Sequence, residues 1–355
     1  MSLGVVSQYS IVHARARAFS STLLGPEVWE RLYAAKDYAA VIGILRGTLY
    51  GAHLAPVEEA ALSPRRAVYQ LKGRLAQVFS AIIRLAPRHA QPLLAQLYRQ
   101  FEVDNLKAAL RGLMIGDSWD HVRYFLFPLG KDTLLPIEAL VRAGSMAAAV
   151  DLLRKTSYYP TLAHAMERYT AEQSLFPLEV ALDLDYWRQL WRGINQLKGR
   201  DRDWALRLAG RLIDMSNLMW ALRYRVYHKL SAEEIIDYTL PFGYRLADED
   251  VRAIAAGGDM AGIVTHVYPG IASVRSYFEQ PEQGLAQLEV RLQQDLAQEC
   301  HAAFIGYPFH IGIPLAYLLL GQMEIHVLTV LIEAKAMQIP VESFQQHLVI
   351  GRPLP

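Results

Sequence analysis

Apolar residues recur at three- and four-residue spacing along most of the chain, and no segment alternates strictly between apolar and polar positions as a half-buried strand does. This spacing places apolar side chains on one face of a helix. Two such stripes consist of Leu106, Ala109, Leu110 and Leu113, and of Leu218, Ala221 and Leu222. Ser231 and Glu234 have the spacing of a capping box, which marks a helix start. The pattern predicts an all-α protein of amphipathic helices.

The chain repeats itself. The frame NLxxALR occurs at residues 105–111 and again at residues 217–223. The residues that follow each copy also correspond, in the same order and at nearly the same spacing. The corresponding pairs are Pro128 with Pro241, Gly130 with Gly243, and Gly144 with Gly258. Agreement at several ordered positions indicates an internal duplication, which determines the architecture.

A third copy lies near the N-terminus, where the frame LRxTxY at residues 45–50 matches residues 153–158. Near the C-terminus, residues 324–328 fall in the register of residues 102–106, as if a fourth copy began there. We therefore predict three helical units, with the partial fourth repeat packing against the first so that the units close around an axis. The predicted boundaries are 1–100, 101–213, 214–322 and 323–355.

Composition excludes several classes of function. The 355 residues include 36 basic and 35 acidic side chains, a net charge of +1, and no polybasic run of the kind that binds phosphates, so nucleic acid is not predicted as a partner. Hydrophobic residues make up 52%, which suggests large internal interfaces or a protein partner. The single cysteine, Cys300, is expected to be a buried apolar residue in a reducing compartment. We read no secretion signal at the N-terminus.

Residues 304–321 form an eighteen-residue stretch without Asp, Glu, Lys or Arg, close to the length that a membrane span requires. Pro308 and Pro314 each remove a backbone donor, and basic anchors do not flank the stretch. We therefore expect a buried helix that is entered through a proline-containing turn.

The familiar motifs of catalysis are missing from the sequence. There is no phosphate-binding loop of the G-x-x-x-x-G-K-S/T type, and HExxH, CxxC and GxSxG are also absent. No catalytic, cofactor-binding or metal-binding residue is therefore predicted. Glu179, Asp183 and Asp185 form the best carboxylate cluster. Because Glu179 and Asp183 share a helix face and repel each other, we expect basic partners or solvent around them, with acid–base catalysis as the alternative.

The repeated polar residues Asn105, Asn217, Arg111 and Arg223 recur because the units recur. We expect each asparagine to bond within its own unit. Each arginine is expected to lay its stem over an apolar face and its head on a neighbouring carboxylate. Contact with a partner protein through Arg111 and Arg223 remains the alternative.

The segment PFHIGIPLAYLLLGQMEIHVL, residues 308–328, resembles the C-terminal signature of the C subunit of the vacuolar/archaeal-type (V/A-type) rotary ATPases, which is called the d subunit in eukaryotes. Five further segments of this chain resemble other regions of the family: HARARAF, LRGTLYGAHL, FEVDNLKAALRGL, LFPLEVALDLDYW and LIDMSNLMWALRYR. Two positions depart from the family pattern: Val327 stands where an asparagine is usual, and Glu333 where a basic residue is usual. The resemblance covers nearly the whole chain.

The resemblance implies an all-α, funnel-shaped protein of three similar domains about a pseudo-threefold axis. It implies a non-catalytic rotor adaptor on the cytoplasmic face of the membrane ring, with the ring and the central shaft as partners, membrane association through protein, no cofactor and no small-molecule substrate. Glu324 and His326 are taken as exposed candidates for partner contact. The alternatives are a helical-repeat scaffold for soluble protein partners and an all-α enzyme.

Overall fold

The computed structural model describes residues 3–55, 62–130, 133 and 135–344. These residues form helices and no strand, which confirms the all-α prediction. The longer helices are α1 (Leu3–Ser20), α5 (Pro64–Leu85), α7 (Gln100–Ile115), α11 (Tyr159–Glu172), α12 (Phe176–Gln196), α14 (Arg211–Arg223), α18 (Pro281–Ala302) and α19 (Gly312–Ala336).

Shorter helices connect the long ones. They are α2 (Pro26–Ala34), α3 (Tyr38–Arg46), α4 (Gly51–Leu54), α6 (Gln91–Tyr98), α8 (Trp119–Val122), α9 (Ile137–Val141), α10 (Met146–Leu152), α13 (Gly199–Ala205), α15 (Ala232–Asp237), α16 (Asp248–Ala255), α17 (Met260–Val267) and α20 (Val341–Phe344). Two π-helical turns, η3 (Leu206–Gly210) and η4 (Tyr224–His228), flank α14, and a 3₁₀ turn, η5 (Val274–Phe278), precedes α18.

Helix ends follow local chemistry. The Ser231 hydroxyl accepts the backbone N–H of Glu234 at 3.2 Å, and the Glu234 carboxylate accepts the backbone N–H of Ser231 at 2.9 Å. The predicted capping box is therefore confirmed, because both otherwise unpaired donors are satisfied. Helix α7 is followed by its C-cap Gly116, whose φ of 68° lies in the left-handed region that favours glycine.

The repeat appears in the packing of the long helices. Helix α7 packs on α12, α14 packs on α18, and α19 packs on α5. Within the repeated stripes, Leu110 and Leu222 are both fully buried, as predicted. In each of these three helix pairs, one helix contains the NLxxALR frame or the residues aligned with it, and the other is a long neighbouring helix. The same apolar stripe therefore forms a similar helix–helix contact in each case.

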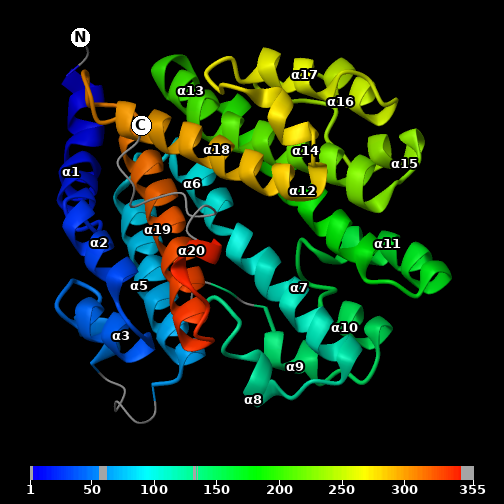
Figure 1. Ribbon diagram of the computed structural model, residues 1–355, viewed down its shortest axis with the longest axis horizontal. Coiled ribbons are helices and arrows are strands. Elements are labelled where there is room, and N and C mark those ends of the chain that lie inside the picture. The colour runs from blue at the N-terminus through cyan, green and yellow to red at the C-terminus, as the bar shows by residue number, and fades with distance from the viewer. Residues whose placement is uncertain (1–2, 56–61, 131–132, 134, 345–355) are drawn as a thin grey trace.

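Helix α19 joins the end of the chain to its beginning, because it packs against α5, α1 and α3 as well as α18 (Figure 1). It is long and apolar enough to cross a membrane, yet 72% of its most apolar stretch is buried inside the protein. The turn through Pro308 leads into the helix, and Pro314 lies in its first turn, where a missing backbone donor costs little. The prediction of a buried helix is confirmed.

The two repeated asparagines hold the loops that follow their helices. The Asn105 amide donates to the Phe127 carbonyl at 2.9 Å and accepts the Phe127 N–H at 2.7 Å. Asn217 makes the same two bonds to Leu240, both at 2.8 Å. Both side chains are buried, so the bonding within each unit that the sequence predicted is confirmed. In α19 the same position is the buried apolar Val327.

Candidate functional site

A cavity of about 450 Å³ lies where six helices meet. Its walls come from α5, α7, α12, α14, α18 and α19, together with the loop after α8, so residues from all parts of the repeat contribute. A larger hollow of about 1190 Å³ is lined by Tyr69 and by residues between 105 and 152, and thus draws almost entirely on one unit. The six-helix cavity is the candidate functional site, because it is the place where the repeats converge.

Three lining residues occupy the same position of three repeated helices. Asp104 of α7, Ser216 of α14 and His326 of α19 each stand two residues after the acidic position of their helix and one residue before the asparagine register. Asp104 and His326 are exposed, and Ser216 is half-buried. One repeated position therefore supplies an acid, a hydroxyl and an imidazole to a single cavity.

The charged lining residues are held by their neighbours. The Lys107 ammonium lies 3.4 Å from the Asp104 carboxylate and 2.7 Å from that of Asp183. Burial opposes the charge of Lys107, but the two carboxylates outweigh it and raise its pKa. The Lys72 ammonium donates to the Phe125 carbonyl at 3.1 Å, and burial lowers its pKa.

His326 is the titratable group of α19 in the cavity. The residue is exposed, but the neighbouring helices partly desolvate its imidazole and lower its pKa, against the opposing effect of Glu289 and Glu333. In its neutral form the ring offers one hydrogen-bond donor and one acceptor.

The other predicted contact residues lie elsewhere. The Arg111 guanidinium makes two hydrogen bonds to the Glu179 carboxylate, from Nε to Oε1 at 2.5 Å and from Nη2 to Oε2 at 2.9 Å. In the equivalent pair, the Arg223 Nη2 lies 2.6 Å from Glu289 Oε2. The carboxylate partner expected for each arginine is confirmed, and so is the basic partner expected for Glu179. The sequence contains a second repeated frame, LEVxL, at residues 178–182 and 288–292, which the predictions above did not use. Its glutamates, Glu179 and Glu289, are the partners of the two repeated arginines.

Glu324 is not exposed, and that expectation is wrong. Only 1% of the residue is accessible, since α19 is enclosed by α1, α3 and α5. Its carboxylate accepts the Tyr50 hydroxyl at 2.6 Å and the Leu24 backbone N–H at 2.7 Å. The same bond recurs in the next unit, where Tyr158 donates to Glu102 at 2.7 Å.

The equivalent acid of α14, Asp214, is buried and accepts the backbone N–H groups of Tyr244 at 2.7 Å and Arg245 at 2.8 Å. Burial outweighs these bonds and raises the pKa of Asp214 to about 6. The Tyr268 hydroxyl lies 3.5 Å from the backbone carbonyl of Arg211. Asp214 thus fixes a loop, whereas Glu102 and Glu324 each accept a tyrosine hydroxyl.

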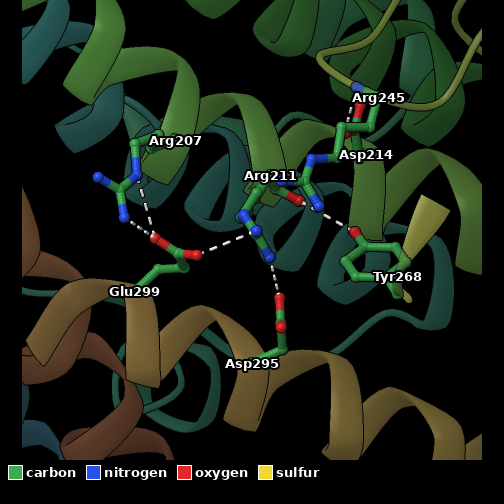
Figure 2. A network of polar contacts seen from close by, with 7 residues as sticks. All are labelled: Arg207, Arg211, Asp214, Arg245, Tyr268, Asp295 and Glu299. Atoms are coloured by element: carbon green, nitrogen blue, oxygen red, sulfur yellow. Dashed lines mark hydrogen bonds and ion pairs between the residues drawn. The ribbon is translucent and has the colours of Figure 1, made fainter. Parts of the chain in front are cut away.

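An ion-pair network joins η3 and α14 to α18 (Figure 2). Arg211, whose side chain is 8% exposed, reaches from α14 to Asp295 and Glu299 on α18, and the Glu299 contact measures 3.0 Å. Arg207 of η3 lies 2.7 Å from the same Glu299. Glu299 thus pairs with both arginines and Arg211 with both carboxylates, and these contacts hold η3, α14 and α18 together.

The described residues contain no group of three or more His, Cys, Asp or Glu side chains placed to hold a metal ion. Cys300 is fully buried, and burial raises the pKa of its thiol well above the ordinary range. This thiol is therefore protonated and enclosed, as expected for a small apolar core residue.

Comparison with known proteins places this arrangement in a family. The family model described as the ATP synthase (C/AC39) subunit matches residues 12–347. The chain belongs to this family. Among its relatives, the C subunit of the A-type ATP synthase of Methanocaldococcus jannaschii is 23% identical over 97% of this chain and 87% of its own length. The corresponding C subunit of Methanococcoides burtonii is 24% identical over 98% of this chain and 96% of its own length.

Family membership makes the chain a non-catalytic subunit of a V/A-type rotary ATPase, as the resemblance implied. An all-α chain without a phosphate-binding loop is consistent with that class.

Proposed function

We propose that this chain is the rotor adaptor of a V/A-type ATPase or ATP synthase. It sits on the cytoplasmic face of the membrane ring and couples the central shaft to that ring for ATP-linked proton or sodium transport. The observation that carries this proposal is the six-helix cavity, whose walls include the repeated position of α7, α14 and α19. A cavity built from all the repeats is suited to holding the end of a shaft along their common axis.

The domain arrangement belongs to the same proposal. The three units, with boundaries at residues 1–100, 101–213 and 214–322, surround a pseudo-threefold axis as a funnel, and residues 323–355 complete the first unit. Support comes from the packing of α19 on α5, which corresponds to the packing of α7 on α12 and of α14 on α18.

An adaptor that passes torque must resist deformation. Bonds between distant segments supply this resistance. They include the bond from Tyr50 to Glu324, across 274 positions, and the ion pairs of the buried Arg211. Dense packing of the helices adds to it, because close-packed interiors have low compressibility. Burial of α19 within the protein supports attachment to the membrane through the ring rather than through a spanning helix.

The test uses the tagged chain in its own host, with gentle solubilisation of membranes and mass spectrometry of the proteins that copurify. A matched pair of variants probes the cavity. Gln293→Trp places bulk in the cavity, and Gln287→Trp makes the same change at an exposed position of the same helix, α18.

We expect the native chain and Gln287→Trp to recover the catalytic subunits, the shaft and the membrane ring. Gln293→Trp should keep the ring and lose the shaft together with the catalytic subunits. Recovery of unrelated soluble proteins alone, with the native chain, would contradict the adaptor proposal and favour a helical-repeat scaffold.

A further inference from the structure

The walls of the six-helix cavity differ in chemistry from one side to another. The titratable lining residues are Lys72 of α5, Asp104 of α7 and His326 of α19. Helices α14 and α18 contribute only uncharged side chains to the lining: Leu212, Met215, Ser216, Gln293 and Leu296. Helices α5, α7 and α19 therefore each bring one ionisable side chain to the lining, among uncharged ones, and α14 and α18 bring none.

This asymmetry is concentrated at the repeated position. The backbone repeat alone would make the three walls similar, and a rod placed between three similar walls could seat in three orientations of nearly equal free energy. Asp104, Ser216 and His326 remove that equivalence, because a charge that faces a carboxylate in one orientation faces a hydroxyl or an imidazole in the others. Charge complementarity fixes orientation in this way at other protein interfaces.

The Asp104 carboxylate is suited to a further contact. Its side chain is 53% exposed although Lys107 lies 3.4 Å away, and an ionised carboxylate can accept several hydrogen bonds. Lys107 is shared with the more buried Asp183, to which it lies closer at 2.7 Å. The positive charge of Lys107 is therefore directed mainly at Asp183. The Lys72 ammonium also feels the charge of Asp104, but it donates its hydrogen bond to the Phe125 carbonyl, so the Asp104 carboxylate can still bind a cation from a partner.

We infer that the side-to-side difference in the cavity fixes one rotational seating of the shaft tip. The tip presents a basic side chain to Asp104 and an apolar side to Leu212, Met215 and Leu296. This inference rests on the proposed function, because it names the chemistry of the partner that occupies the same cavity. A single seating transmits rotation without slipping to a neighbouring orientation.

The experiment uses the complex of this chain with its shaft subunits, imaged as single particles and sorted by the rotation of the shaft relative to this chain. The decisive variant combines Asp104→Ser with Ser216→Asp, which moves the acid from α7 to the equivalent position of α14. A second variant, Asp104→Ser with His326→Ser, removes the difference between the walls. The control combines Asp120→Ser with His164→Ser, which makes the same two changes at exposed positions outside the cavity.

The native complex and the control should show one seating. The variant with the relocated acid should reduce the share of the native seating and populate a second seating about a third of a turn away, because the acid moves while Leu212, Met215 and Leu296 stay in place. The variant without acid or imidazole should lose at least about tenfold of the preference for one seating, which is about 1.4 kcal/mol. The two variants change the cavity in different ways, since the first moves the acid and the second removes it. If one of them does not fold, the other still tests the inference.

Two outcomes separate the inference from the function on which it rests. If the native chain does not bind the shaft at all, the proposed function fails. If every variant binds the shaft in the native seating with unchanged preference, the adaptor function stands and the inference about Asp104, Ser216 and His326 is overturned.

Discussion

The Tyr50 hydroxyl donates a 2.6 Å hydrogen bond to the buried carboxylate of Glu324, and this bond joins the first unit to the last long helix. The two residues are 274 positions apart. Tyr158 and Glu102 repeat the bond at 2.7 Å within the second unit. The closure of the chain end onto its beginning thus uses the same chemistry as the interior of a unit.

Replacing Tyr50 with phenylalanine should lower the free energy of unfolding by about 1–3 kcal/mol, because Glu324 stays buried and loses one of its donors. Urea denaturation at neutral pH measures the loss. Tyr227→Phe is the control, since that hydroxyl is on an exposed residue and water can replace its bonds to the carbonyls of Pro281 and Glu282. Equal stability of the two variants would show that the bond does not hold the chain end.

Leu110→Ala and Leu222→Ala should each cost about 2–5 kcal/mol, as other truncations of fully buried leucines do. The reason is the lost burial of apolar atoms together with the cavity that remains. Thermal unfolding followed by circular dichroism measures the change. The exposed Leu152 provides the comparison, and Leu152→Ala should change stability by less than about 0.5 kcal/mol. An unaltered melting temperature for Leu110→Ala would mean that the repeated stripe is not part of the core.

Replacement of Arg111 and of Arg211 by alanine should lower the free energy of unfolding by very different amounts, although both arginines pair with carboxylates. Arg111→Ala should lower the free energy of unfolding by less than about 1 kcal/mol, because the Arg111 side chain is 61% exposed and its removal opens the Glu179 carboxylate to water. Arg211→Ala should cost about 3–5 kcal/mol, since it leaves Asp295 and Glu299 half-enclosed without this partner. Urea denaturation at low and high salt compares them. Similar losses for both variants would contradict the distinction.

Stability should fall as the pH is lowered from about 6.5 towards 4, in part through His310. Burial lowers the pKa of His310 to about 4, and its Nδ1 accepts the Gly312 N–H at 3.0 Å while its ring stacks on Trp204. In that pH window the unfolded chain binds a proton that the folded chain does not, so folding is disfavoured. The size is on the order of 3 kcal/mol, at about 1.4 kcal/mol for each pKa unit.

His310→Asn keeps an acceptor near the Gly312 N–H and removes the titration. The difference in unfolding free energy between the native chain and this variant should therefore change between pH 6.5 and 4 and level off above pH 7. A difference that stays constant across the whole range would mean that His310 titrates in the folded chain as it does in water.

The isolated chain should neither bind nor hydrolyse ATP, because its sequence contains no phosphate-binding loop. Isothermal titration with ATP and magnesium, followed by a phosphate-release assay, provides the measurement. Binding in the micromolar range would count directly against a purely mechanical role.

Local pattern was enough for several parts of the architecture. The three- and four-residue spacing predicted helices, and the NLxxALR frame predicted equivalent asparagine bonds at Asn105 and Asn217. Each of these depends on residues within about one unit, so the information is present in a short stretch of sequence. The sequence predicted that Arg111 and Arg223 would each pair with a carboxylate but did not say which one. The structure identifies the partners as Glu179 and Glu289, which occupy the same position of the LEVxL frame.

The sequence by itself thus determined the class of structure, the repeat and the family, whereas tertiary packing decided where each polar group lies. Glu324 and His326 are two residues apart on one helix, yet the first is enclosed by α1, α3 and α5 and the second faces the cavity. The same packing brings Asp104, Ser216 and His326 to one cavity. Periodicity fixes the face of a helix on which a residue lies, but the partner of that face is set by contacts between segments far apart in the chain.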